Sequence, residues 1–262
     1  MADILLTNDD GFNAIGFLAL LKELSKDFSV AAVAPETEKS WIGKSISKGQ
    51  PLSLNKTKIN GFDAFTVNGS PADCVQIGLY DVMNRKPKLV VSGINPGENV
   101  GHARILSSGT IGAAMEASIG GVKAIASSLY IPDDKRGIDF FGKENISIFK
   151  NAAEITSRLV KIFVEKDFGE GVDLLSVNIP FEATVDSDFA ITIPFREPYG
   201  KLFEKKGGKF VHSRPLLDFR NLMEGTDLKA LAEGKISITP ISLELVSMES
   251  LAKMKKTIEA EW

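Results

Sequence analysis

Residues 4–11 read ILLTNDDG: a short apolar run, Ile4–Thr7, is followed at once by Asn8-Asp9-Asp10-Gly11. An apolar run of this length that ends in turn residues is typical of a buried strand. The next segment, Ile15–Leu24, has apolar residues at helical spacing, and Phe28–Ala34 is a second apolar run that ends at Pro35. Strand, helix and strand in this order predict a parallel βαβ unit at the start of an α/β fold.

The alternation continues through most of the chain. Further helices are predicted at Pro71–Met83, Thr110–Ile119 and Lys143–Val164, and further strands at Leu89–Ser92, Val122–Ser127 and Leu174–Ile179. Beyond Pro180 the alternation of predicted strands and helices becomes less regular. Residues 186–216 predict an extended hairpin arm, Ile236–Ile238 a late strand, and Glu249–Glu259 a terminal helix. We therefore predict a Rossmann-like, three-layer α/β fold with a mostly parallel sheet, a C-terminal β-hairpin arm and a terminal helix.

The two parts of the chain are predicted to have different roles. Residues 1–185 carry the polar loops and should form the catalytic core. Residues 186–262 contain the arm, whose apolar side chains are too dispersed to form a core of their own (Phe195, Leu202, Phe203 and Phe210). Apolar side chains of this kind indicate contact with another subunit, so we expect the C-terminal part to serve oligomerisation.

Composition excludes several classes of protein. The chain has 262 residues, one cysteine and a net charge of −3, so neither a disulfide framework nor a basic nucleic-acid-binding surface is expected. No apolar run approaches the ~20 residues of a membrane span. The first residues, MADILLTNDD, lack the basic and apolar regions of a signal peptide. We expect a cytoplasmic protein that binds neither membrane nor nucleic-acid polymer, although a small anion in one local pocket remains compatible with this charge.

Four polar segments are predicted to follow strands, where parallel sheets bind ligands. They are Thr7–Gly11, Pro35–Ser47, Gly93–Gly101 and Leu106–Gly112. Their convergence on one edge of the sheet would form a polar site.

Two adjacent carboxylates, Asp9 and Asp10, stand in the first of these segments. They repel each other unless a positive charge lies beside them, and a divalent cation is the common remedy. An ordinary turn, with Asp9 capping the next helix, is the alternative. The chain has only two histidines, His102 and His212, which we interpret as an exposed loop residue and a residue without a role. An all-oxygen site of Asp, Ser and Asn would suit Mg²⁺ or Mn²⁺.

Ser108-Gly109-Thr110 opens a predicted helix that is rich in small residues. Free N–H groups at a helix N-terminus form an anion site, and beside a metal site the anion would be phosphate. The alternative is a plain serine N-cap with tight helix–sheet packing. Standard phosphate and hydrolase motifs are missing: Glu38 stands at the first glycine position of a P-loop ending in Gly43-Lys44-Ser45, and no G-x-S-x-G elbow is present.

Five ordered motifs resemble the SurE survival-protein family of stationary-phase 5′/3′-nucleotidases. The first is residues 4–11, and the second is Val33-Ala34-Pro35 together with Ser40 and residues 43–46. The third is residues 69–75, the fourth is residues 91–95 together with Gly97, Asn99 and Gly101, and the fifth is residues 108–114. Residues 236–241 add a further match near the end of the chain. Three residues depart from the family pattern. Ser70 replaces a usual Thr, Trp41 replaces a small residue after Ser40, and Ser107 replaces a Tyr or His.

The resemblance implies a set of functional residues. Asp9, Asp10, Ser40 and Asn95 would bind one divalent cation per subunit, and Asn99 with Ser108, Gly109 and Thr110 would contact substrate. The implied reaction is hydrolysis of nucleoside 5′- and 3′-monophosphates, with short polyphosphate as a further substrate. The implied assembly is a homodimer or homotetramer in which the C-terminal arm is exchanged between subunits.

These residues predict hydrolysis by a metal-activated water, with Asp9 or Asp10 orienting or deprotonating it. The alternative from another class is a non-catalytic regulator of the same fold that binds a nucleotide or metal. A receiver domain is disfavoured, because Leu89–Ser92 is followed by Gly93-Ile94-Asn95 rather than by the required Asp.

Overall fold

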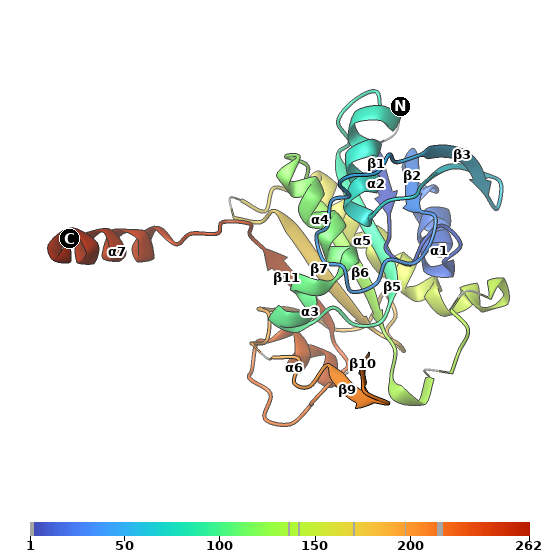
Figure 1. The fold of residues 1–262 in the computed structure, drawn as a ribbon. Helices are drawn as coiled ribbons and strands as arrows, with labels where there is room; N and C mark the ends of the chain where they lie inside the picture. The colour runs from blue at the N-terminus through green and yellow to red at the C-terminus, as the bar shows by residue number, and fades with distance from the viewer. Residues whose placement is uncertain (1–2, 136, 141, 170, 197, 214–216) are drawn as a thin grey trace.

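A nine-stranded sheet runs through the whole molecule in the order β3-β4-β2-β1-β5-β6-β7-β11-β8 (Figure 1). The computed structural model describes residues 3–262 except 136, 141, 170, 197 and 214–216. The strands are β1 (Ile4–Thr7), β2 (Val30–Pro35), β3 (Leu54–Ile59), β4 (Phe62–Val67), β5 (Leu89–Pro96), β6 (Ala124–Tyr130), β7 (Leu174–Pro180), β8 (Phe189–Ile191) and β11 (Ile236–Ile241). Strands β4, β2, β1, β5, β6 and β7 are mutually parallel, which confirms the predicted fold class.

Helices cover both faces of this sheet. The α-helices of the described residues are α1 (Ile15–Leu24), α2 (Pro71–Ile77), α3 (Gly101–Ser107), α4 (Gly109–Ile119), α5 (Lys150–Glu165), α6 (Asp227–Ala232) and α7 (Met248–Glu261). Helices α1 and α5 pack together on one face, around Phe17 and Phe149, and α2 packs against α4 on the other. Strands β1 and β7 are buried along their whole length, as expected of parallel strands covered on both sides.

Several boundaries differ from the prediction. Helix α2 continues as a single π-helical turn, Gly78–Val82, and residues 143–149 form a 3₁₀ segment before α5. The antiparallel hairpin β3–β4 was not predicted, although its turn is Asn60-Gly61. Both residues have positive φ, 48° and 91°, which is the conformation that an Asn-Gly hairpin turn requires.

The C-terminal part is joined to the main sheet. Strand β11 pairs antiparallel with β7, and β8 pairs parallel with β11. The predicted arm therefore begins with a sheet strand, and only β9 (Phe203–Lys206) and β10 (Lys209–His212) form its hairpin. Residues 197 and 214–216 of the predicted arm lie outside the described residues. Phe195 is not dispersed, because it packs with Val100 and Leu228 in a small third cluster.

Helix α7 lies apart from the rest of the molecule, at the end of an extended segment (Figure 1). None of its residues is buried. Among the described residues, no helix is both long and apolar enough to cross a membrane.

Candidate active site

The strand order reverses at β1, with β2 on one side and β5 on the other. The loop after β1 and the end of β5 therefore meet at one edge of the sheet. Such a switch point leaves a crevice between neighbouring loops, and open α/β sheets bind ligands there. Asp9 and Asp10 follow β1, and Asn95 lies near the end of β5.

The backbone of the Asp9-Asp10 turn is held by two hydrogen bonds. The Asn8 side chain donates to the Gly11 carbonyl at 2.9 Å, and the Lys39 amide donates to the Asp9 carbonyl at 2.7 Å. Helix α1 begins after Ala14, which makes no side-chain cap. Asp9 therefore does not cap this helix, and the capping alternative is wrong.

The start of α4 lies directly behind Asp9. The Thr110 hydroxyl donates to Asp9 Oδ1 at 2.6 Å. A Cβ on Gly109 would come within 2.8 Å of Asp9 Cβ and 2.9 Å of its Oδ2, so only glycine leaves this carboxylate in place. Ser108 is the N-cap of α4 and accepts from the Ile111 amide at 3.1 Å. The segment 106–112 joins α3 to α4 and does not follow a strand, contrary to our prediction.

Burial disfavours the charged form of both carboxyl groups. It raises the pKa of Asp9 from 3.8 to about 6, against the opposing hydrogen bonds from Thr110. Burial and the neighbouring charge of Asp9 raise the pKa of Asp10 well above its ordinary value. The nearby negative charge of Glu38 raises both pKa values further. Asp10 Oδ2 is buried without a hydrogen-bond partner among the described residues.

These raised pKa values predict how the metal-free protein responds to pH. A carboxyl group with a raised pKa binds its proton more tightly in the folded state, so its contribution to stability is lost as pH rises from about 4 to about 6. The Asp9→Asn protein has no titrating group at position 9, so it does not lose this contribution. The mutant's advantage in free energy of unfolding should therefore grow over that range, by on the order of 2 kcal/mol. Urea denaturation in EDTA at several pH values measures it. A difference in free energy of unfolding between mutant and wild type that stays constant with pH would contradict a raised pKa at Asp9.

Ser40 and Asn95 line the same pocket as Asp9 and Asp10. Ser40 is exposed in the loop after β2 and donates to Glu38 Oε1 at 2.6 Å. The Gly43 amide of this loop donates to the Ser107 carbonyl at 2.9 Å, which fastens the loop to the α3–α4 junction. Asn95 donates from its side-chain nitrogen to the Gly97 carbonyl at 2.8 Å, so its oxygen is the atom that can serve as a ligand.

A polar cavity of about 290 Å³ brings most of the predicted residues together. Its walls include Asp9, Asp10, Ser40, Asn95, Asn99 and Ser108. Gly109 and Thr110 lie behind Asp9 and are not among the lining residues. Asn99 is held by its side chain, which donates to Ser128 Oγ at 2.8 Å. His102 lies exposed on α3, rather than in a loop, and is outside the lining.

Sequence reasoning missed several lining residues: Glu38, Glu98, Arg104 and Phe140. Arg104 Nε lies 3.8 Å from Glu98 Oε1, and both side chains are nearly buried. Glu98 stands in a predicted polar segment and was open to prediction. Arg104 was not, because α3 itself was not predicted.

The donor set fits a hard divalent cation. No group of three or more His, Cys, Asp or Glu side chains arranged for a metal occurs in the part of the chain that the structure describes. The predicted ligands in the pocket are instead the carboxylates of Asp9 and Asp10, the Ser40 hydroxyl and the Asn95 amide, and Asp10 Oδ2 has no hydrogen-bond partner among the described residues. Oxygen ligands of this kind suit Mg²⁺ or Mn²⁺ rather than zinc.

Fold and pocket together define a doubly wound α/β protein with paired buried carboxylates at its switch point. The family described as "Survival protein SurE" matches residues 4–200. A protein named 5′-nucleotidase SurE from Archaeoglobus fulgidus is 38% identical over 93% of this chain and 92% of its own. One from Methanoregula boonei is 39% identical over 97% of each chain. The crystal structure of the SurE protein from Aquifex aeolicus has a TM-score of 0.75 at 30% identity, covering 96% of this chain and 99% of its own. The chain belongs to the SurE family.

Proposed function

We propose that this chain is a metal-dependent phosphomonoesterase that hydrolyses nucleoside 5′-monophosphates, and 3′-monophosphates as well, to nucleoside and phosphate. The observation that carries the proposal is the pair of buried carboxylates, Asp9 and Asp10, in a small polar pocket at the switch point of the sheet. The names of the relatives support the same activity. Short polyphosphate is proposed as a further substrate.

Asp9, Asp10, Ser40 and Asn95 are the proposed ligands of one Mg²⁺ or Mn²⁺ per subunit. When bound, the cation would polarise a phosphoryl oxygen and lower the pKa of a coordinated water. It would also offset the burial and the neighbouring negative charge that raise the pKa of both carboxyl groups. Thr110 has a positioning role, since its hydroxyl orients Asp9 Oδ1.

Substrate binding requires positive charge in an acidic pocket. Arg104 is the cation among the described lining residues, and its side chain is 11% exposed. It is proposed to face the phosphoryl group together with Ser108, which lines the cavity at the N-terminus of α4, where the helix dipole favours anions. Gly109 and Thr110, predicted as substrate contacts, lie behind Asp9 and would act through it. Asn99 is proposed to hydrogen-bond the substrate.

One of the two aspartates would accept the proton of the attacking water. The pKa of about 6 at Asp9 belongs to the metal-free protein, and a bound cation would lower it by favouring the carboxylate.

A non-catalytic binder of nucleotide or metal is the competing hypothesis. The two are separated by turnover of a chromogenic phosphate ester, such as p-nitrophenyl phosphate, with Mn²⁺ present. Metal-dependent release of phosphate supports the enzyme. Metal and nucleotide binding without turnover supports the regulator.

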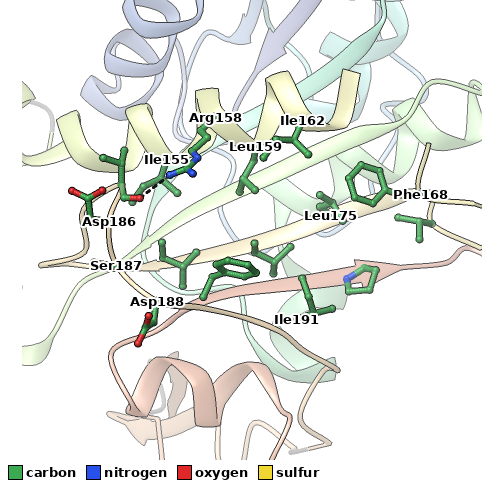
Figure 2. Close-up of a pocket in the computed structure, with 16 residues that line it drawn as sticks. Ile155, Arg158, Leu159, Ile162, Phe168, Leu175, Asp186, Ser187, Asp188 and Ile191 are labelled. Carbon is green, nitrogen blue, oxygen red and sulfur yellow. Dashed lines mark hydrogen bonds between the residues drawn. The ribbon is translucent and has the colours of Figure 1, made fainter. Parts of the chain in front are cut away.

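A homodimer or homotetramer is the proposed assembly, with residues 1–185 as the catalytic core and 186–262 as the assembly part. An apolar groove of about 730 Å³ lies between α5 and strands β8 and β11 (Figure 2). Leu159 and Ile162 on α5 form one wall, and Ile191 lies on the other. The proposed occupant is helix α7 of a second copy, whose apolar residues Leu251, Met254 and Ile258 are exposed.

Charged residues flank the apolar surfaces of both the groove and α7. Asp186 and Asp188 lie at one end of the groove (Figure 2), and α7 carries Lys253, Lys255 and Lys256. Helix α7 also carries Glu249, Glu259 and Glu261, so its side chains have no net charge, and the proposal rests on the exposed apolar residues of α7 and the apolar lining of the groove.

Met254→Glu is expected to weaken this assembly. The substitution places a charge on the apolar side of α7, so light scattering of a dilute sample with Mn²⁺ should show a mass shifted toward the monomer. Ile119→Glu is the matched control, because Ile119 is also exposed but lies at the end of α4, outside the groove. A wild-type protein that is monomeric under these conditions would rule out the assembly.

Cytoplasmic localisation is proposed as well, with a small nucleotide rather than a nucleic-acid polymer or a membrane as the partner. The single cysteine, Cys74, is free and buried, which is compatible with a reducing compartment.

A further inference from the structure

One wall of the pocket is a tryptophan. Trp41 directly follows Ser40 and lines the same cavity as Asp9 and Asp10. Its side chain remains 41% exposed although aromatic residues surround it. An aromatic surface that is open to solvent and adjoins a polar pocket is suited to a ligand with one polar end and one flat, aromatic end.

The Trp41 ring is held in place from the arm. Its centroid lies 4.7 Å from that of His212, at an edge-on angle of 67°, and 5.5 Å from that of Tyr199. Tyr199 is itself anchored, because its hydroxyl donates to the Ser107 side chain and the Ala103 carbonyl. The ring is therefore fastened to the α3–α4 junction, the same part of the molecule that positions Asp9.

The backbone of Trp41 is also unusual. Its φ of 62° lies in the left-handed region, which is unfavourable for a bulky residue. Such a conformation persists where the surroundings hold it, and it is common at ligand-binding sites. Here it turns the loop so that Ser40 and Trp41 both line the cavity.

We propose that Trp41 is the platform on which the nucleobase of the substrate stacks. The phosphate would lie at the Asp9–Asp10 end of the cavity, and the base would cover the exposed part of the indole. This inference rests on the proposed function, since it assigns the part of the substrate that distinguishes a nucleotide from a simple phosphate ester. Because every base has an aromatic face, stacking alone predicts broad base tolerance.

Kinetics with two substrates test the platform. AMP carries a base and ribose 5-phosphate lacks one. Stacking on an aromatic side chain is worth roughly 1–3 kcal/mol, so Trp41→Ala should lower kcat/KM for AMP about 10- to 100-fold, mainly through KM. The effect on ribose 5-phosphate should be several times smaller, and Trp41→Phe should restore much of the loss. Trp262→Ala, which removes the chain's other tryptophan, is the matched control. An equal loss on both substrates would overturn the platform and leave Trp41 as a packing residue.

Fluorescence gives a second readout that does not depend on catalysis. In a Trp262→Phe background, Trp41 is the remaining tryptophan. Titrating adenosine into the metal-loaded protein should give saturable quenching, whereas ribose should give none. Equal responses to adenosine and ribose would refute the platform. Quenching by adenosine in a protein that hydrolyses no phosphate ester would instead refute the proposed enzyme and retain the base site.

Discussion

Asp9→Asn is expected to lower turnover of AMP by at least about a thousandfold while leaving the fold intact. The substitution nearly preserves shape but removes one charge from the proposed metal site. Metal catalysis contributes several kcal/mol, and each 1.36 kcal/mol is a factor of about ten in rate. Since burial opposes the Asp9 charge, the metal-free mutant should melt at the same temperature as wild type or higher. Added Mn²⁺ should stabilise wild type strongly and the mutant weakly.

Phosphate release from AMP and melting curves with and without Mn²⁺ measure these effects. Asp63→Asn is the matched control, because Asp63 is exposed and pairs with Lys58 far from the pocket in sequence and fold. It should change neither rate nor metal response. A mutant at position 9 that kept most of its activity and its metal-induced shift would remove Asp9 from the site.

Gly109→Ala is the second substitution with a large expected effect. The added methyl group would lie 2.8 Å from Asp9 Cβ and 3.0 Å from the Lys39 carbonyl, so the Asp9 side chain must move. Misplacement of a catalytic group by about 1 Å can cost on the order of 10²-fold in rate. We expect a loss of that size in kcat, together with weaker metal binding.

Gly137→Ala provides the comparison for this prediction. Nothing lies within 4 Å of a Cβ at Gly137, so the same change in composition should be silent there. Circular dichroism and melting separate a displaced carboxylate from a general loss of fold. Wild-type kcat in Gly109→Ala would mean that Asp9 need not occupy its observed position.

The sequence was sufficient to predict the fold class because the six strands from β4 to β7 are parallel. Strands buried on both faces are short apolar runs, and each is followed by turn residues or an amphipathic helix. The prediction of strands from the sequence failed where the strands are exposed. β3 is mostly solvated and lacks the apolar run that marks a buried strand. β8 is apolar, but it is only three residues long and both of its ends are exposed.

The candidate site was predictable where it follows a buried strand. Asp9 and Asp10 come directly after β1, so their position followed from the strand itself. Asn95 is a more complicated case. It lies inside β5, after a register irregularity, and Gly93 has a φ of 135° that no pattern of apolar residues indicates.

Long-range contacts account for what the sequence did not reveal. The hydrogen bond from Thr110 to Asp9 joins residues that are 101 positions apart, and Trp41 meets His212 across a still longer separation. Periodicity reports local structure and contains no information about such pairs. Glu38, like Glu98, stands in a predicted polar segment, whereas the place of Arg104 at the pocket became apparent only with helix α3.

Hydrolysis of AMP by protein stripped with EDTA, before and after Mn²⁺ is restored, tests the central claim most directly. The stripped protein should release phosphate at no more than a small fraction of the original rate, and one equivalent of Mn²⁺ per subunit should restore it. Asp9→Asn treated in the same way should not recover. Full activity after exhaustive removal of metal would contradict a catalytic cation at Asp9 and Asp10.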